Sequence, residues 1–245
     1  MHALESGLNA VRVPDGPDLR VDVRASEDGL IIAEDLAGSL SHRGYRAPRQ
    51  QAPLREHLGA QMVALSHWRP EDEPLIDPMC GSGTILAEAW GWARGEPVQR
   101  VSRWMSPSPV IRPEVRPRLW GFEREVNALS AARFSFQTIG ALDDIRLSHR
   151  SISKASSKRW TEPTGVILAN PPYGVRLSGE GLEALRSLRA WFMQMSPGWR
   201  LFVLGLRDPL ETVFPESPSM LKRMPNGPLP TVLMGFHRDR LSSRP

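Results

Sequence analysis

Residues 75–84, with the sequence LIDPMCGSGT, decide how this chain folds. Leu75 and Ile76 predict a short buried strand, and a glycine-rich turn then leads into a predicted helix over 84–93. A strand, such a turn and a helix in this order form the first half of a βαβ unit. The turn has no lysine after its last glycine and lacks GxGxxG spacing. It is therefore neither a phosphate-binding P-loop nor a dinucleotide-binding fingerprint.

Outward from this stretch, apolar runs and helical periodicities alternate along the chain. Such alternation predicts an α/β fold with a doubly wound, mostly parallel sheet. Residues 94–118 are rich in Pro and Arg without periodicity and predict an inserted loop. Residues 19–36 predict two strands around a turn. Further strands are predicted at 119–122, 145–147, 166–169, 201–206 and 231–236, and further helices at 54–68, 126–137 and 182–195.

Three polar motifs follow predicted strands: DPMCGSG (77–83), GFERE (121–125) and NPPYG (170–174). In a parallel sheet the carboxyl ends of the strands meet at one edge, and ligands bind there. We therefore expect the three motifs to form one site.

The first two motifs suit a methyl donor with an amino-acid part and an adenosyl part. Asp77 can balance an ammonium group, and Gly81 and Gly83 leave room for an adenosyl sugar. Glu123 can accept hydrogen bonds from both ribose hydroxyls. Thr84, at the start of the predicted helix, completes this set. S-adenosylmethionine fits these needs.

Beside the glycines, Cys80 has no histidine fixed next to it in sequence. We therefore interpret it as a small buried packing residue and not as a nucleophile.

The third motif is the most specific. Pro171 and Pro172 end the strand and stiffen the loop. The side-chain oxygen of Asn170 and the carbonyl of Pro171 could both accept from one exocyclic NH2 group and stabilise positive charge as it forms on nitrogen. Tyr173 offers a face for stacking a flat ring. These four residues are the candidate catalytic set.

The composition is that of a globular protein, with 245 residues, 40% hydrophobic and 24% charged. One cysteine excludes an internal disulfide and a multi-cysteine metal site, and the histidines show no metal-like spacing, so we expect no metal. No stretch approaches the ~20 apolar residues of a membrane span, and the start lacks the features of a secretory signal. We expect a cytoplasmic protein with no membrane partner.

Charge is distributed unevenly along the chain. Residues 1–75 hold 8 basic and 12 acidic side chains, whereas residues 90–160 hold 13 basic and 6 acidic ones. A basic middle suits a polyanion such as RNA or DNA. A bias toward arginine in the coding sequence is the alternative explanation.

Together, DPMCGSGTILAEA, GFERE and NPPYG resemble the class I S-adenosylmethionine-dependent methyltransferases that modify exocyclic amines. The chain resembles more narrowly the THUMP-linked RNA guanine-N2 methyltransferases, notably the bacterial large-subunit rRNA enzymes and the related tRNA enzymes. Three further segments carry this narrower resemblance: LAGSLSHRGYR, APLREHLGA and MPNGPLPTVLMGF. The resemblance covers about residues 19–237. It implies a Rossmann-like sheet of seven strands, mostly parallel, with a terminal antiparallel strand. It also implies an rRNA or tRNA substrate whose guanine N2 is presented by the loop over Asn170–Tyr173.

Two departures from the family pattern follow. Residues 1–45 resemble only the last strands of a THUMP module, and residues 46–245 resemble the methyltransferase domain, so a separate RNA-binding protein is a candidate partner. Where the family often has an acidic residue that contacts the adenine amine, this chain has Ser151, whose hydroxyl accepts more weakly.

Two other functions compete with an RNA guanine-N2 methyltransferase. The NPPY chemistry also permits methylation of adenine N6 in DNA or of a protein glutamine. The departures permit a truncated relative that keeps the fold but has weak or no catalysis.

Overall fold

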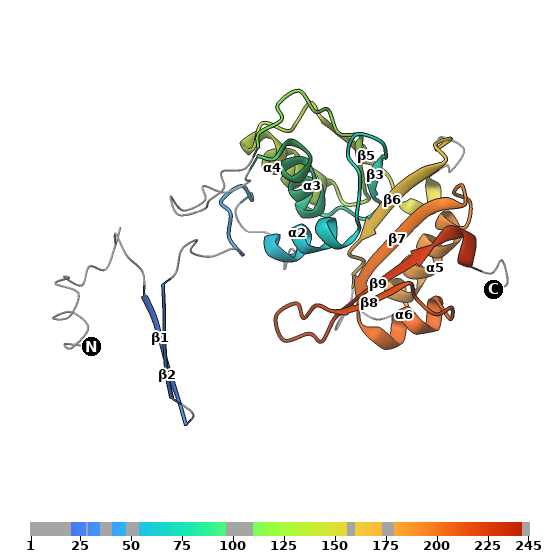
Figure 1. The fold of residues 1–245 in the computed structure, drawn as a ribbon. Helices are drawn as coiled ribbons and strands as arrows, with labels where there is room; N and C mark the ends of the chain where they lie inside the picture. Colours follow the sequence, from blue (N-terminus) through green and yellow to red (C-terminus); the bar gives the residue numbers. More distant parts are fainter. Residues whose placement is uncertain are drawn as a thin grey trace. The chain divides into compact units, whose positions relative to one another are not determined.

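The computed structural model describes residues 21–27, 29–34, 41–47, 54–96, 110–155, 160–172 and 179–241. Within these ranges a hairpin precedes a unit in which strands and helices alternate (Figure 1). The strands are β1 (Val21–Ser26), β2 (Gly29–Glu34), β3 (Leu75–Asp77), β4 (Leu119–Glu123), β5 (Ile145–His149), β6 (Thr164–Ala169), β7 (Gly198–Gly205), β8 (Met220–Arg223) and β9 (Val232–His237). The helices are α2 (Glu56–Leu65), α3 (Thr84–Arg94), α4 (Val126–Thr138), α5 (Glu180–Phe192) and α6 (Arg207–Val213), with short 3-10 turns η1 (Ile152–Lys154) and η3 (Arg238–Arg240).

Seven of these strands form one sheet in the order β5-β4-β3-β6-β7-β9-β8. β5, β4, β3, β6 and β7 are parallel, whereas β9 runs antiparallel to both of its neighbours, β7 and β8. The predicted doubly wound, mostly parallel sheet with a terminal antiparallel strand is confirmed. The strand order reverses between β3 and β6, and in open α/β sheets this switch point is where ligands bind.

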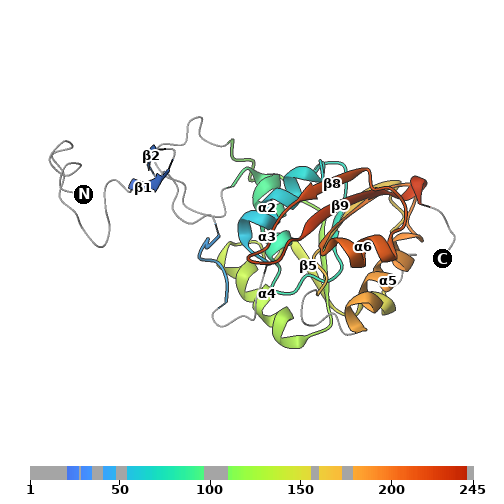
Figure 2. The same ribbon diagram turned by 90° about the horizontal axis from the view of Figure 1, so that it is seen from below.

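Helices cover both faces of this sheet (Figures 1 and 2). Leu75 of β3 belongs to the apolar cluster that includes α2, α3 and α4, whereas its neighbour Ile76 belongs to the cluster that includes α5 and α6. Val166 and Ile167 of β6 divide in the same way, because successive side chains of a strand point to opposite faces. Strands buried on both faces read as continuous apolar runs, which explains why LID and VILA were recognisable in the sequence.

The elements predicted from periodicity are present, with ends shifted by a few residues. α6 and β8 were missed. α6 is short and contains Pro209, and β8 is largely exposed, so neither shows an amphipathic repeat. Apart from Arg94, which ends α3, the part of the predicted 94–118 loop that the structure describes forms no helix or strand. Residues 97–109 lie outside the described ranges.

The predicted strands in 19–36 form the hairpin β1–β2, which belongs to a compact unit of its own. The register pairs Val23 with Ile32 and Ala25 with Leu30, so these side chains share one face. Val23, Leu30 and Ile32 are nevertheless exposed. Because these side chains stay exposed, their burial adds little free energy to the hairpin. A two-stranded hairpin by itself is only marginally stable.

The lead-in segment RGYR is fixed to the helices of the larger unit. The Arg43 guanidinium pairs with the buried Glu88 carboxylate of α3 at 2.6 Å, and the Tyr45 hydroxyl donates to the other Glu88 oxygen at 2.8 Å. Arg46 pairs with the buried Glu56 of α2 at 2.9 Å. Burial raises the pKa of Glu88 to about 7, and burial together with Glu88 raises the pKa of Tyr45.

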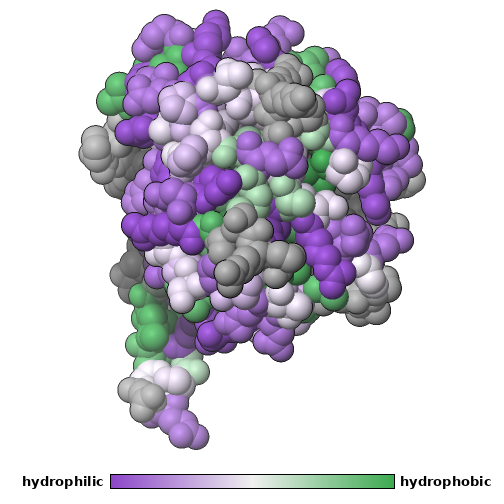
Figure 3. Space-filling model, turned by 90° about the vertical axis from the view of Figure 1, so that its right-hand side faces the viewer, coloured by the Kyte–Doolittle hydropathy of each residue, from purple (hydrophilic) through white to green (hydrophobic). Residues whose placement is uncertain are grey.

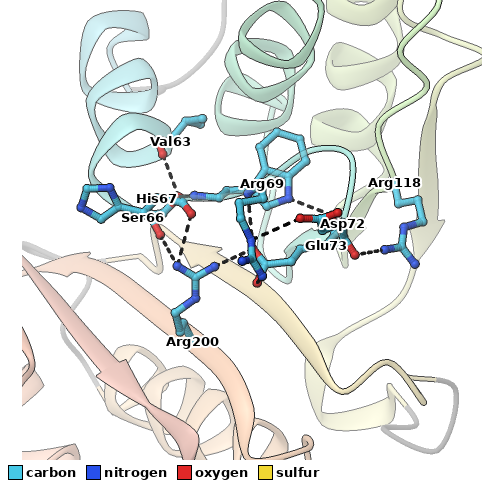
Figure 4. Close-up of polar contacts among 9 residues, drawn as sticks. Val63, Ser66, His67, Arg69, Asp72, Glu73, Arg118 and Arg200 are labelled. Atoms are coloured by element: carbon cyan, nitrogen blue, oxygen red, sulfur yellow. Dashed lines mark hydrogen bonds and ion pairs between the residues drawn. The ribbon is translucent and has the colours of Figure 1, made fainter.

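At the amino end of the sheet, Arg200 of β7 holds the loop between α2 and β3 (Figure 4). Its guanidinium donates to the carbonyls of Ser66 at 2.7 Å and His67 at 3.3 Å, and it pairs with Glu73 at 2.6 Å. Glu73 is buried and is also paired with Arg69 at 3.1 Å. This cluster lies at the edge opposite to the polar motifs and fixes the start of β3.

The face of the molecule drawn in Figure 3 is mainly hydrophilic. Among the described residues no helix combines the length and apolarity needed to cross a membrane.

Candidate active site

The carboxyl ends of β3, β4 and β6 bring the three polar motifs to one edge of the sheet. Asp77 ends β3 in register with Gly121 of β4, and Ile76 is in register with Ile167 of β6. Asn170 therefore lies two residues beyond the level of Asp77 on the adjacent strand, roughly 7 Å along it. The predicted meeting of the motifs is confirmed for the residues that the structure describes; Tyr173 lies outside the described ranges.

The glycine turn adopts the left-handed conformation that only glycine takes without strain. Gly81 has φ 53°, and a side chain built on it would meet no atom within 4 Å. Gly81 therefore exposes backbone to a ligand. Gly83 has φ 82°, but a Cβ there would lie 2.5 Å from the ring of Phe136 on α4. The missing side chain at Gly83 thus lets α3 and α4 pack closely.

Thr84 is buried at the start of α3, and its methyl group faces Gly59 of α2. Cys80 is also buried, and its sulfur lies close to Gly121. Burial raises the pKa of the Cys80 thiol well above its usual value. The predicted burial of Cys80 is confirmed.

Asp77 is a buried carboxylate that faces the glycine turn. Its Oδ1 accepts a hydrogen bond from the Met79 backbone N–H at 3.1 Å. Desolvation raises the pKa of Asp77 to about 8, against the opposing effect of the Met79 hydrogen bond and with a further increase from the charge of Glu123. A cationic ligand group beside Asp77 would favour its ionised form.

Glu123 joins β4 to the glycine turn. Its Oε2 accepts from the Gly81 N–H at 2.9 Å, and its Oε1 accepts from the Glu125 N–H at 2.8 Å. These two bonds fix the carboxylate and also hold the turn against the end of β4. Each carboxylate oxygen has further acceptor capacity, so Glu123 can still accept from a hydroxyl.

Asn170 follows the buried end of β6 and is partly buried itself. Its Oδ1 is buried and accepts no hydrogen bond from any described residue. A buried acceptor without a donor costs free energy, and native structures keep such atoms rarely. The atom is therefore available to a donor group on a bound molecule. Pro171, next to it, is buried, and Pro172 is exposed.

Ser151 lies just after β5, on the side of Glu123 away from β3 and the glycine turn. Its hydroxyl is 3.0 Å from that of Ser153. The Arg150 N–H donates to the Glu123 carbonyl at 2.9 Å, which ties this segment to β4.

Ser151 lines a cavity of about 550 Å³ together with Arg124, His149, Arg150 and Lys154. Arg124 belongs to the motif GFERE, whereas His149, Arg150 and Lys154 belong to none of the three motifs. A group of basic side chains follows directly after two strands, at the edge where ligands bind. This pattern in the sequence could have indicated that they line a site. Among the described residues no group of histidine, cysteine or acidic side chains could hold a metal ion.

The model of the RMKL-like methyltransferase domain matches residues 43–233 of this chain. The chain belongs to this family. It is therefore an S-adenosylmethionine-dependent methyltransferase of class I, which confirms the broader of the two resemblances found in the sequence. The match begins at Arg43, the residue that pairs with Glu88.

Solved structures share the fold of this methyltransferase. SMU.472 in complex with SAH superposes with a TM-score of 0.78 at 24% identity, over 98% of this chain and 68% of that one. A protein described as a predicted N6-adenine-specific DNA methylase from Listeria monocytogenes gives 0.75 and 22%, over 96% and 65%. TrmN from Thermus thermophilus gives 0.70 and 22%, over 96% and 64%. The methyltransferase spans about two thirds of the length of these proteins.

Proposed function

We propose that this methyltransferase transfers a methyl group to the exocyclic N2 of guanine in RNA, either rRNA or tRNA. The observation that carries the proposal is the buried Oδ1 of Asn170, which lacks a hydrogen-bond donor among the described residues. An exocyclic NH2 group supplies such a donor. The position of Asn170, just after the strand next to that of Asp77 and at the switch point, supports a substrate amine bound beside the proposed donor site.

The residues present fit S-adenosylmethionine, which when bound supplies a methyl group on a sulfonium centre. Gly81 presents open backbone, and Glu123 can accept from ribose hydroxyls on the side away from Gly81. Asp77 can pair with the ammonium group. Ser151 can accept from the adenine amine.

Asn170 and the Pro171 carbonyl hold the substrate amine and orient its lone pair toward the methyl group. They also stabilise the positive charge that develops on nitrogen during transfer. The proton leaves after transfer, so no general base is needed before attack. Tyr173 is proposed to stack on the flipped base.

RNA is favoured as the substrate by the residues that resemble guanine-N2 enzymes and by the basic stretch over 90–160. Residues 1–45 are proposed to correspond to the last strands of a THUMP module, and a separate RNA-binding protein is a proposed partner. Adenine N6 in DNA is the second candidate, favoured by the likeness to the Listeria protein. A protein glutamine and a relative with weak catalysis complete the alternatives.

The test uses labelled S-adenosylmethionine with RNA, DNA or protein as acceptor, and compares Asn170→Ala with the wild type. We expect label in RNA, and we expect Asn170→Ala to lower transfer at least 100-fold while the Kd for S-adenosylhomocysteine changes less than twofold. Asn127→Ala, on the exposed surface of α4, is the matched control and should transfer normally.

Different results point to different alternatives. Label in DNA or protein would replace RNA as the substrate. Equal loss of transfer and of donor binding in Asn170→Ala would contradict the role assigned to Asn170. No heat on titrating S-adenosylhomocysteine into the wild type would support the relative with weak or no catalysis.

A further inference from the structure

We propose that a second cavity, at the amino ends of β4 and β5, binds a phosphodiester of the substrate RNA away from the reacting base. The cavity has a volume of about 240 Å³. Its polar and aromatic lining consists of three arginines, two aspartates and one tryptophan: Arg116, Arg118, Arg146, Asp143, Asp144 and Trp120. This inference rests on the proposed function, because it gives the RNA substrate a second contact.

This cavity lies at the edge of the sheet opposite to the three polar motifs. Leu119 begins β4, Ile145 begins β5, and the two residues are in register. β4 has five residues, so its first residue lies roughly 13 Å from Glu123 at its other end. None of the residues assigned to the methyl donor lines the cavity. The cavity is therefore separate from the donor site.

Arg146 is a cation of the lining that has no acidic partner. It is exposed, and among the described residues no carboxylate lies within ion-pair distance of it. Its guanidinium carbon lies 5.5 Å from the centre of the Trp120 ring, which orients the side chain. The two residues are in register on adjacent strands, so their side chains leave the same face of the sheet. A planar guanidinium held in this way can donate two hydrogen bonds to one phosphate.

The other two cations have acidic partners that they can exchange for a phosphate. Arg116 lies 3.7 Å from Asp144 and is 67% exposed, and Arg118 lies 3.5 Å from Glu162 and is 40% exposed. Ion pairs between exposed groups contribute little to stability, so exchanging them costs little free energy. Arg116 also donates to the Pro113 carbonyl at 3.1 Å, a contact that leaves its positive charge available to a ligand.

The two aspartates of the lining differ in how they affect an anion. Asp144 is largely buried, accepts a hydrogen bond from Trp90 Nε1 at 2.8 Å and lies 3.8 Å from the Arg94 guanidinium. Its charge is therefore already balanced within the protein. Asp143 is exposed and opposes an anion in the cavity. Three arginines against two aspartates leave the lining with a net charge of +1, which favours an anionic ligand.

The position of the cavity favours the backbone of the substrate RNA as the source of that anion. β5 is the outer strand at its end of the sheet and runs parallel to β4, from the cavity toward the edge that carries the motifs. RNA with its guanine at Asn170 can follow the side of the sheet to the cavity. Contacts to phosphate position a nucleic acid without reading its sequence, so this site should add affinity without base preference.

The experiment compares the wild type with Arg116→Gln/Arg146→Gln, which removes two cations from the lining. Binding of a guanine-containing single-stranded RNA is measured without the methyl donor, from about 50 to 200 mM salt. We expect the Kd for RNA to rise roughly 10-fold and the slope of log Kd against log salt to fall by about 1, because fewer phosphates are neutralised.

A second variant should act in the opposite direction. Asp143→Asn removes the exposed negative charge from the same lining, so the Kd for the same RNA should fall roughly two- to threefold. The Kd for S-adenosylhomocysteine should change less than twofold in both variants, because the donor site lies at the other edge of the sheet.

Matched controls make the same changes in net charge elsewhere. Lys222→Gln/Arg223→Gln removes two cations from exposed positions of β8, at the other end of the strand order. Asp239→Asn removes one exposed carboxylate after β9. Each control should change the Kd for RNA by less than twofold. Single-stranded DNA of the same sequence is measured in parallel, and an equal loss of RNA and DNA binding in Arg116→Gln/Arg146→Gln supports a phosphodiester site.

Four results would overturn the inference. Three concern the arginine variant: unchanged RNA affinity, an equal loss in the β8 control, or a loss confined to RNA, which would assign the cavity to a group that DNA lacks. The fourth is a higher Kd for RNA in Asp143→Asn, since the carboxylate would then assist binding. Failure of the proposed function is distinguishable, because it appears as a wild type that binds RNA but transfers no methyl group to it.

Discussion

Folding and ligand binding favour different protonation states of the Asp77 carboxyl. Burial raises the pKa of its carboxyl to about 8, so the folded protein prefers the neutral form at neutral pH. A ligand ammonium group prefers the ionised form. Folding therefore favours the protonated carboxyl and ligand binding favours the ionised one. As a result, both the stability of the fold and the affinity for the ligand depend on pH.

The first consequence concerns stability. The folded-state pKa of Asp77 lies above the ordinary value near 3.9, so between about pH 4 and pH 8 the folded state binds more protons than the unfolded state. The free energy of unfolding then falls as pH rises through this window, by on the order of 1 kcal/mol per pH unit from this group. We expect Asp77→Asn to be more stable than wild type at pH 8 and similar at pH 4. Urea unfolding at several pH values measures this difference.

The same variant should bind the donor product less tightly. Loss of one charge-assisted hydrogen bond predicts roughly a 10-fold higher Kd for S-adenosylhomocysteine at pH 8. Asp143→Asn, at an exposed position, should change neither stability nor affinity. Glu88, whose pKa burial raises to about 7, adds to the pH dependence in the same direction and remains in both variants. A variant at Asp77 that keeps the slope of the wild type would contradict this account.

At the scale of single residues, the sequence predicted positions better than roles. Asp77, Glu123 and Asn170 were recognisable because each ends or follows an apolar strand, and that position alone brings them to the ligand edge. The contact of Gly83 with Phe136 joins two helices that are far apart in sequence, so no local pattern shows it. The bonds of Glu123 to two backbone N–H groups were hidden for the same reason.

At the scale of elements, Arg200 shows how the sheet fixes the loop that starts β3 (Figure 4). Its partner Glu73 is 2% exposed, and Arg200 is 15% exposed. Removing one partner of a buried ion pair leaves an uncompensated charge, which typically costs about 3–5 kcal/mol. We expect Arg200→Met to lower the free energy of unfolding by about 3 kcal/mol, because Arg69 still pairs with Glu73. Chemical denaturation measures this loss.

A second variant separates the ion pair from general damage to β7. In Arg200→Met/Glu73→Gln no buried charge is left, so the double variant should recover part of the loss. Arg186→Met, at an exposed position on α5, should change stability by less than about 0.5 kcal/mol. A double variant no more stable than Arg200→Met would show that the pair with Glu73 is not the main contribution of Arg200.

Helices and strands could be predicted from the sequence where a strand is buried on both faces or where a helix has a regular apolar stripe. β3, β6 and β7 are buried on both faces and read as apolar runs, and α5 shows a regular apolar stripe. β8 exposes three of its four residues and is held in the sheet by its pairing with β9. Its strand conformation therefore comes from tertiary contacts, which no local pattern encodes.

At the scale of the whole molecule, the family match and the described anchoring contacts begin within a few residues of each other. The match starts at residue 43, and Arg43, Tyr45 and Arg46 are the residues that bind the buried Glu88 and Glu56. β1 and β2 belong to a different compact unit, and their side chains are exposed. RGYR thus contributes contacts to the start of the methyltransferase fold, and just before it the Ser41 hydroxyl lies 2.9 Å from His57 Nδ1 of α2.

Removal of residues 1–39 should leave the methyltransferase unit folded. The remaining chain keeps both apolar clusters and all the contacts of RGYR. We expect the Tm to change by less than about 3 °C, which corresponds to about 1 kcal/mol for a chain of this size. The Kd for S-adenosylhomocysteine should stay within twofold. A thermal scan and calorimetry measure the two quantities.

The matched control removes seven residues more and starts at Ala47. This chain loses Arg43, Tyr45 and Arg46, so Glu88 and Glu56 remain buried without these partners. Uncompensated buried carboxylates cost several kcal/mol each when ionised, so the Tm should fall by at least about 8 °C at pH 8 and by less at pH 5, where Glu88 is protonated. If both truncations lowered the Tm equally, the hairpin and not RGYR would be what stabilises the start of the fold.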